Sequence, residues 1–239
     1  MSFPRIAAAS LAAAAVLCAF QGRMADAQDA ETTERALFFS GADLSGTSAF
    51  LFGGFIWAPE GINAAGFAMK TLFGGGFYRY RSGAQEIVGR QVVDSIMPGW
   101  RFKREKFEAS VFAGLDMQNH RFHPLDPGNR LAGEHFGLRI AGDAWWEPSP
   151  DTMATGWASW STTGANYSAR AAYGWRPAGL FYFGPEAQVM GDGSYNELRF
   201  GIHATAWRSG PLEWSAGGGY AHSRSSDGAN VRLGVLARQ

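Results

Sequence analysis

The sequence is almost free of cysteine. Cys18 is the only one among 239 residues, and it lies in an N-terminal apolar stretch that we expect to be removed. A mature chain without thiols forms neither a disulfide framework nor a thiolate metal site. The bulky Leu17 before Cys18 also disfavours a lipoprotein signal.

Long apolar runs are absent as well. A membrane-spanning helix needs roughly 20 apolar residues, and no window of the chain reaches that length. The short run 6–20 follows Arg5 and precedes Ala25-Asp26-Ala27, which is typical of a cleavable secretory signal. We therefore predict a signal peptide over 1–27, an N-terminal leader over 28–36 and one domain over 37–239.

The chain has no excess of either charge. It has 21 basic and 21 acidic residues, and removal of Arg5, Arg23 and Asp26 with the signal leaves a net charge near −1. A neutral chain has no electrostatic basis for binding phosphate backbones, so a nucleic-acid partner is excluded.

Glycine and aromatic residues are abundant, with 32 Gly, 18 Phe and 9 Trp, and apolar and polar residues alternate in many short segments. Alternation with a period of two indicates strands with one apolar and one polar face. The predicted strands are 37–44, 48–58, 66–80, 85–100, 107–118, 134–146, 153–161, 166–175, 180–190, 197–207, 212–222 and 230–237.

The strand 107–118 has the clearest pattern. Phe107, Val111 and Leu115 face one way, whereas Asp116 and Gln118 face the other. A polar inner face and an apolar outer face are typical of an outer-membrane barrel. We therefore predict an all-β fold, a single antiparallel transmembrane β-barrel of about 12 strands. Its lumen holds a charge network of Arg139, Asp143, Arg170, Glu186, Arg199 and His203.

The connections agree with this fold. The longest, 119–133, is the fifth, so it lies outside the cell if the mature N-terminus is periplasmic, and several even-numbered connections are short and contain proline. The alternative is a soluble two-layer sandwich that binds carbohydrate. Strands of ten residues or more favour the barrel, because globular strands average five or six.

The tryptophans have two interpretations, an aromatic girdle at the membrane surface or sugar stacking. Six lie near predicted strand ends, where a girdle places them: Trp57, Trp100, Trp145, Trp146, Trp175 and Trp207. Trp157 and Trp160 lie further inside their strand and are the candidates for a sugar contact.

Enzymatic and metal sites are weakly indicated. His120 and His123 lack a convincing third metal ligand, and no pair of carboxylates has a spacing that singles it out for glycoside hydrolysis. A lipid-modifying barrel enzyme remains an alternative, with His120, His203 or His222 as its histidine. We expect no cofactor and no catalytic residue.

Three stretches resemble BcsS-type cellulose biosynthesis proteins of Gram-negative bacteria. They are Phe39-Ser40-Gly41-Ala42-Asp43 leading to Trp57-Ala58-Pro59, then Phe112-Ala113-Gly114 through His120 with Leu125-Asp126-Pro127-Gly128 and Phe136-Gly137, and Tyr182-Phe183-Gly184-Pro185-Glu186-Ala187. The resemblance implies an outer-membrane accessory protein of a cellulose synthesis and export system, and it supplies no catalytic residues.

We therefore expect a non-enzymatic protein of the outer membrane, surrounded by its lipid, with a scaffold or docking role. Its expected partners are other cellulose synthase or export subunits, or cellulose itself.

Overall fold

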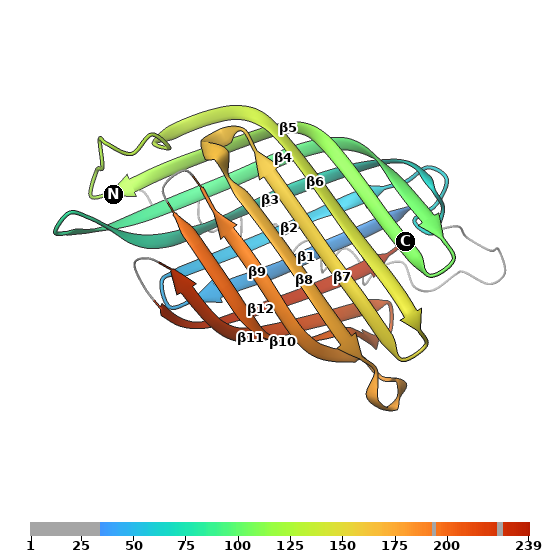
Figure 1. Cartoon of the computed structure of the whole chain (residues 1–239). Helices are drawn as coiled ribbons and strands as arrows, with labels where there is room; N and C mark the ends of the chain where they lie inside the picture. Colours follow the sequence, from blue (N-terminus) through green and yellow to red (C-terminus); the bar gives the residue numbers. More distant parts are fainter. Residues whose placement is uncertain (1–33, 193–194, 224–226) are drawn as a thin grey trace. The chain divides into compact units, whose positions relative to one another are not determined.

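Twelve antiparallel strands form one closed barrel (Figure 1). This computed structural model describes residues 34–192, 195–223 and 227–239, so the predicted signal peptide and residues 28–33 of the leader lie outside the described residues. The predicted barrel and its strand count are confirmed. The strands are β1 (Ala36–Ser45), β2 (Ser48–Trp57), β3 (Gly66–Ser82), β4 (Gln85–Arg104), β5 (Phe107–His123), β6 (Gly133–Ser149), β7 (Thr152–Ser161), β8 (Tyr167–Trp175), β9 (Tyr182–Gly191), β10 (Asn196–Ser209), β11 (Leu212–Ser223) and β12 (Asp227–Arg238).

Two 3-10 helices, η2 (Thr163–Ala165) and η3 (Pro177–Gly179), lie in the connections after β7 and β8. Within the described residues, no helix is long and apolar enough to cross a membrane.

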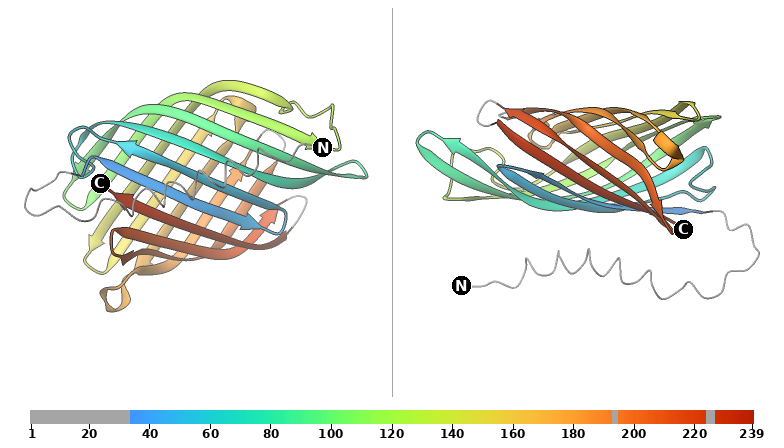
Figure 2. Two further views of the ribbon diagram at one scale, coloured as in Figure 1. Left: turned by 180° about the vertical axis from the view of Figure 1, so that it is seen from behind. Right: turned by 90° about the horizontal axis from the view of Figure 1, so that it is seen from below.

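The barrel closes where β1 pairs with β12. The pairing runs from Leu37 opposite Arg238 to Ser45 opposite Asn230, and Figure 2 shows the two strands side by side. The N–H of Ala36 also donates to the carbonyl of Gln239 at 2.7 Å. Each strand is therefore paired on both sides over most of its length, and the sheet closes on itself.

The two ends of the barrel differ. Ala36 and Gln239 lie together at one end, which we call the terminus end. The opposite end, called the loop end, carries the β3–β4 hairpin and the longest connection, 124–132. The predicted long fifth connection therefore lies at the end opposite the termini.

The outward face is apolar because of the alternation along each strand. Leu115 of β5 is 65% exposed, whereas its neighbour Asp116 is 2% exposed. The same contrast recurs on other strands, with exposed outward Leu51, Ile140, Phe200 and Leu233. A continuous apolar outer wall around a partly polar interior suits a hydrocarbon environment.

Tryptophans form a partial ring on the outward face at the terminus end. Even-numbered strands run toward this end, and the last residues of several of them are exposed: Trp57, Trp100, Trp146, Trp175 and Trp207. Five of the six predicted girdle tryptophans therefore lie outward near a strand end. Trp145 does not, because its place in the alternation turns it inward, where its ring packs against that of Tyr182 with centroids 5.7 Å apart.

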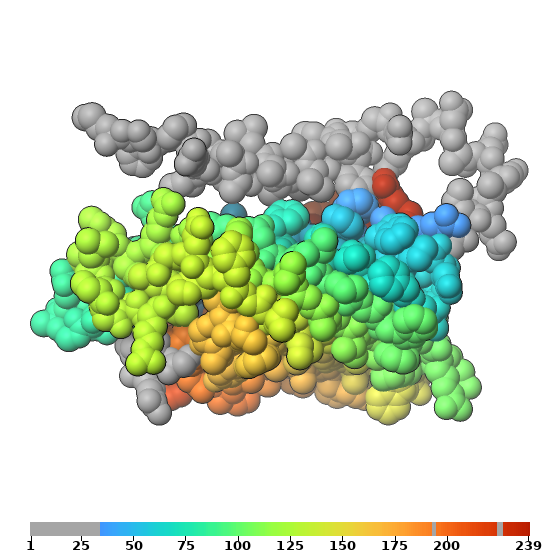
Figure 3. Space-filling view, turned by 90° about the horizontal axis from the view of Figure 1, so that it is seen from above, coloured from blue at the N-terminus to red at the C-terminus, as the bar shows by residue number. Residues whose placement is uncertain are grey.

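The strands have unequal lengths, and this makes the wall uneven. β4 has 20 residues, whereas β1 and β2 have 10 each. The pairing of β2 with β3 ends at Ser48 opposite Tyr78, so the rest of β3 pairs only with β4. The loop-end parts of β3, β4, β5 and β6, called the projecting wall, extend beyond the short strands, and Figure 3 shows the β3–β4 hairpin furthest out.

The predicted ends of two long strands were wrong, one at each end of the barrel. The predicted strand 85–100 stops before the observed end of β4 at Arg104, and 107–118 stops before the observed end of β5 at His123. Both extensions contain basic and aromatic residues that break the simple alternation of apolar with polar.

Candidate functional site: the lumen

Charged and polar side chains fill much of the lumen, in three hydrogen-bonded groups. The first centres on Asp116 of β5. Its carboxylate accepts hydrogen bonds from Ser95 Oγ at 2.7 Å, Gln118 Nε2 at 2.7 Å and Ser161 Oγ at 2.5 Å. Arg139 donates from Nε at 2.8 Å and from Nη2 at 3.2 Å. A buried carboxylate with this many donors is stabilised in its charged form.

The second group joins strands that are not neighbours in the barrel. Glu186 of β9 accepts from Arg170 Nε at 2.9 Å, and from Arg232 Nη2 at 2.6 Å. Arg232 belongs to β12, three strands away from β9 in the barrel. Gly217 makes room for the carboxylate, because a Cβ there would lie 2.5 Å from Glu186 Oε1.

The third group also crosses the lumen. Arg199 of β10 donates from Nη1 to Asp43 Oδ1 of β1 at 2.5 Å, and from Nε to Glu197. β1 and β10 are likewise three strands apart. These ion pairs therefore connect distant strands through the interior and do not simply line the wall.

The structure distributes the six predicted network residues over these groups and beyond them. Arg139, Arg170, Glu186 and Arg199 lie in the three groups. Asp143 lies apart, with its Oδ1 3.6 Å from Lys70 Nζ and its side chain 39% exposed. The six residues therefore do not form a single network.

His203, the sixth residue, makes no ion pair with any residue that the structure describes. Its Nδ1 is 2.9 Å from Thr205 Oγ1, and its Nε2 is 3.2 Å from the carbonyl oxygen of Tyr173. A buried imidazole held by a hydroxyl and a backbone carbonyl is satisfied by hydrogen bonds alone.

Several charged partners in the lumen are not among the six predicted network residues. Asp116 and Glu197 are predicted to face inward but not as part of the network, and Asp43, Lys70 and Arg232 are not predicted as lumen groups. Their inward positions follow from the alternation. Their partners depend on which strands face each other across the closed barrel, and no local pattern reports that.

The terminus end of the lumen is apolar, and there the expectation of a polar interior was wrong. Ile62, in the connection between β2 and β3, is 3% exposed and packs with Ile56, Met97 and Phe112. Arg101 Nη2 fixes this connection by donating to the carbonyl of Ile62 at 2.7 Å. Lys70 covers the cluster, with its Nζ 5.2 Å from the centre of the Phe112 ring.

The loop end is held by an aromatic and polar cluster on the inner face of the projecting wall. Tyr80 OH donates to Asp126 Oδ2 at 2.7 Å and accepts from Asn129 Nδ2 at 2.9 Å, which ties the long connection to β3. Burial and the hydrogen bond to Asp126 raise the pKa of Tyr80 to about 12, so its phenol keeps the proton that it donates. The rings of Tyr80 and Phe122 meet edge to face, with centroids 6.0 Å apart.

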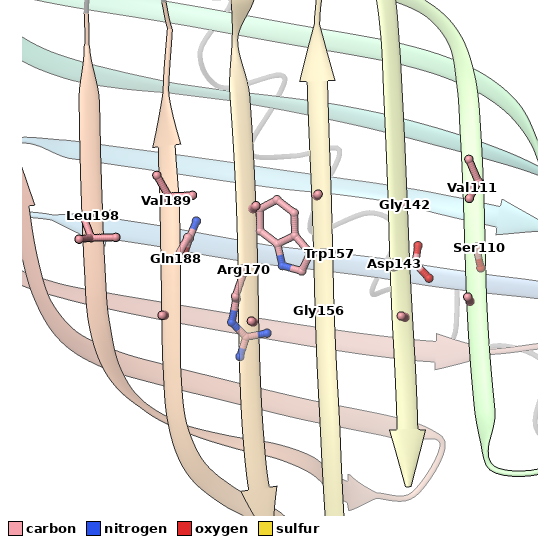
Figure 4. Close-up of a pocket in the computed structure, with 16 residues that line it drawn as sticks. Ser110, Val111, Gly142, Asp143, Gly156, Trp157, Arg170, Gln188, Val189 and Leu198 are labelled. Carbon is pink, nitrogen blue, oxygen red and sulfur yellow. The ribbon is translucent and has the colours of Figure 1, made fainter. Parts of the chain in front are cut away.

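Trp157 and Trp160 lie on opposite faces of β7. Trp160 is 46% exposed on the outward face, and Trp157 lies inward, directly between Asp143 and Arg170 of the neighbouring strands. Figure 4 draws Trp157, Arg170 and Asp143 on neighbouring strands. The open hollow of about 640 Å³ on this wall lies mainly on the opposite, outward face, because most of its lining residues are outward, among them Ala144, Gly156 and Ala171. The two tryptophans cannot form one sugar platform, and a sugar contact at Trp157 stays a prediction.

The described residues assemble no hydrolytic triad from the histidines considered above. The buried Ser161 donates directly to Asp116, with no imidazole between them. His120 instead contacts Gln118 Oε1 and Tyr78 OH, each at 3.2 Å. His123 faces outward, and no group of three or more possible metal ligands occurs in the described part of the chain.

Comparison with solved structures supports the fold. An outer membrane channel from Pseudomonas putida F1 has a TM-score of 0.54 and 10% sequence identity, over 90% of this chain and 100% of that chain. The translocator domain of the autotransporter NalP from Neisseria meningitidis has a TM-score of 0.53 and 12% identity, over 98% and 97%. At these identities the likeness shows the outer-membrane barrel fold alone.

Comparison with sequences identifies the family. No curated protein matches the chain. The sequence profile described as "Cellulose biosynthesis protein BcsS" matches residues 37–239, which is the whole strand region but its first residue. The chain therefore belongs to the BcsS family of cellulose biosynthesis proteins.

Proposed function

We propose that the protein is a non-enzymatic component of cellulose export in the outer membrane, and that it acts as a scaffold or docking site. The observation that carries this proposal is the pair of ion-pair groups that cross the lumen, Arg199 with Asp43 and Arg232 with Glu186. A conduit for a glucan chain needs a wide continuous lumen, and these buried side chains extend into the lumen from strands that are not neighbours.

Side chains also narrow the lumen at both ends of the barrel. The apolar cluster around Ile62 fills the terminus end, and the cluster of Tyr80, Phe122 and Asp126 narrows the loop end. The exposed surfaces left for a partner are the projecting wall outside the cell and the short turns in the periplasm. Subunits of cellulose synthesis or export, or the emerging polymer, are the partners that the family suggests.

A barrel filled in this way should conduct poorly. We expect no large steady conductance from the wild-type protein in planar bilayers, because buried ion pairs block the lumen. Arg199→Ala should raise the conductance for small ions, since it opens one of the crossing groups. Arg208→Ala is the matched control, because the Arg208 side chain is 73% exposed and pairs with Glu213 at 3.6 Å, away from the lumen groups. A large steady conductance of the wild-type protein would overturn the filled-lumen interpretation.

The lumen groups should differ in their effect on stability. Asp116→Ala leaves Arg139 buried without its partner, and we expect a loss of about 3–5 kcal/mol in the free energy of unfolding. Asp143→Ala removes a longer and more exposed ion pair, so its loss should stay below about 1 kcal/mol. Urea unfolding in phospholipid vesicles, followed by tryptophan fluorescence, measures both. Equal losses would contradict the central place given to Asp116.

Deletion of the gene tests the proposed role directly. A docking role in export predicts less cellulose outside the cell, with continued synthesis inside. Cellulose is measured in both fractions after complementation with the wild-type protein and with Arg199→Ala. The variant should restore export if the lumen is not the path of the polymer. Unchanged cellulose in both fractions of the deletion strain would refute a role in export.

The enzyme alternative makes a different prediction. His120 and His203 are buried and held by hydrogen bonds to groups other than serine, and the exposed His222 contacts Asp227 Oδ1 through its Nδ1 at 2.6 Å. Alanine at His120, His203 or His222 should therefore leave the lipid A and phospholipid profiles of the cell unchanged. Mass spectrometry of extracted lipids measures this. A modification that disappears with one of these variants would favour an enzyme.

A further inference from the structure

Three arginines without carboxylate partners cluster on the outward face of the projecting wall. Arg90 of β4 lies directly opposite Arg121 of β5. On β3, Phe77 lies directly opposite Arg90. Arg79, two residues further along β3 on the same face, is therefore the diagonal neighbour of Arg90. All three residues are exposed, and the described residues provide no ion pair for any of them. We call them the arginine cluster.

This arrangement is unfavourable in isolation. Directly opposite residues on one face have Cβ atoms about 4.5–5.5 Å apart, and like charges at such positions destabilise a sheet. The nearest outward carboxylates have other neighbours. Glu134 accepts from Asn119 Nδ2 at 3.1 Å, and Glu86 lies opposite Arg81 at the hairpin tip. An anion bound between Arg90 and Arg121 would remove the repulsion.

The arginine cluster lies at the upper edge of the apolar wall. Toward the terminus end, the next outward residues on β3 and β4 are Phe77, which is 42% exposed, and Val92, which is 50% exposed, whereas on β5 the polar Asn119 comes next. Arg90 is also level with Ala49, close to the tip of the short β1–β2 hairpin, because both pair with Phe77. The guanidinium groups therefore lie where hydrocarbon gives way to lipid headgroups.

We propose that the arginine cluster binds the phosphate groups of a lipid A glycolipid in the outer leaflet, with the acyl chains against Phe77 and Val92. A guanidinium is a planar fork that binds phosphate oxygens in pairs. The opposed Arg90 and Arg121 bracket one phosphate, and Arg79, at a diagonal spacing of about 7–8 Å, reaches a second. This inference rests on the outer-membrane placement in the proposed function but not on any role in cellulose export.

The test uses the whole mature protein in detergent micelles with purified diphosphoryl lipid A as the probe, and native mass spectrometry as the readout. We expect the double variant Arg90→Gln/Arg121→Gln to bind at least about tenfold more weakly than the wild type, and Arg79→Gln about threefold more weakly. Arg104→Gln is the matched control, because Arg104 lies on the same outward face of β4 at the terminus end. It should bind like the wild type.

Further probes identify the ligand chemistry. Dephosphorylated lipid A and inorganic phosphate alone should both bind at least about tenfold more weakly than diphosphoryl lipid A. Equal binding of the dephosphorylated lipid would overturn the proposal by showing that acyl chains suffice, and equal binding of free phosphate would overturn the lipid as occupant. An equal loss of lipid A binding in Arg104→Gln would overturn the proposal, by showing that binding depends on the general positive charge of the protein and not on the arginine cluster. Heat-modifiable electrophoretic mobility checks that each variant is folded, and Arg79→Gln alone still tests the cluster if the double variant is not.

Discussion

The pairing of β1 with β12 is the constraint on which the rest of the structure depends. It turns a twelve-strand sheet into a cylinder and thereby gives each residue an inside or an outside. Only after closure can Arg199 reach Asp43, because β10 and β1 lie nine strands apart in a flat meander. Arg232 and Glu186 lie on β12 and β9, and the curvature of the closed barrel brings them together. The crossing ion pairs in turn connect β1 and β12 to β10 and β9. Closure and lumen charge therefore stabilise each other.

Burial of so many charges is costly unless every one is compensated. The Asp116 carboxylate meets this requirement with a bidentate arginine, two hydroxyls and an amide. Such an arrangement tolerates little change, because removal of one member leaves the others without partners. An aqueous pore has no need of it, since water would solvate each group. The lumen thus has the character of a packed polar core, with an apolar core at the terminus end.

Much of this architecture could be predicted from the sequence, because alternation is local. The strand count, the inward side of Asp116 and the outward side of Leu115 all follow from a period of two. The failures come from longer-range effects. Trp145 was assigned to the girdle from its place near a strand end. The alternation along β6 turns it inward, because its neighbour Trp146 faces outward. The partners of Asp143 and Arg199 include residues on strands that are not their neighbours, which local alternation does not report. The loop-end part of β5 was not predicted as a strand, because its outward residues beyond Met117 are polar.

The unequal strand lengths have a consequence for how the protein meets its surroundings. With β4 twice as long as β1, the rim is high on one side and low on the other. A barrel with an even rim presents the same height to neighbours on every side, whereas this barrel presents a high side and a low side within the plane of the bilayer. A neighbouring protein that contacts the high side can therefore be held in a defined orientation relative to the barrel.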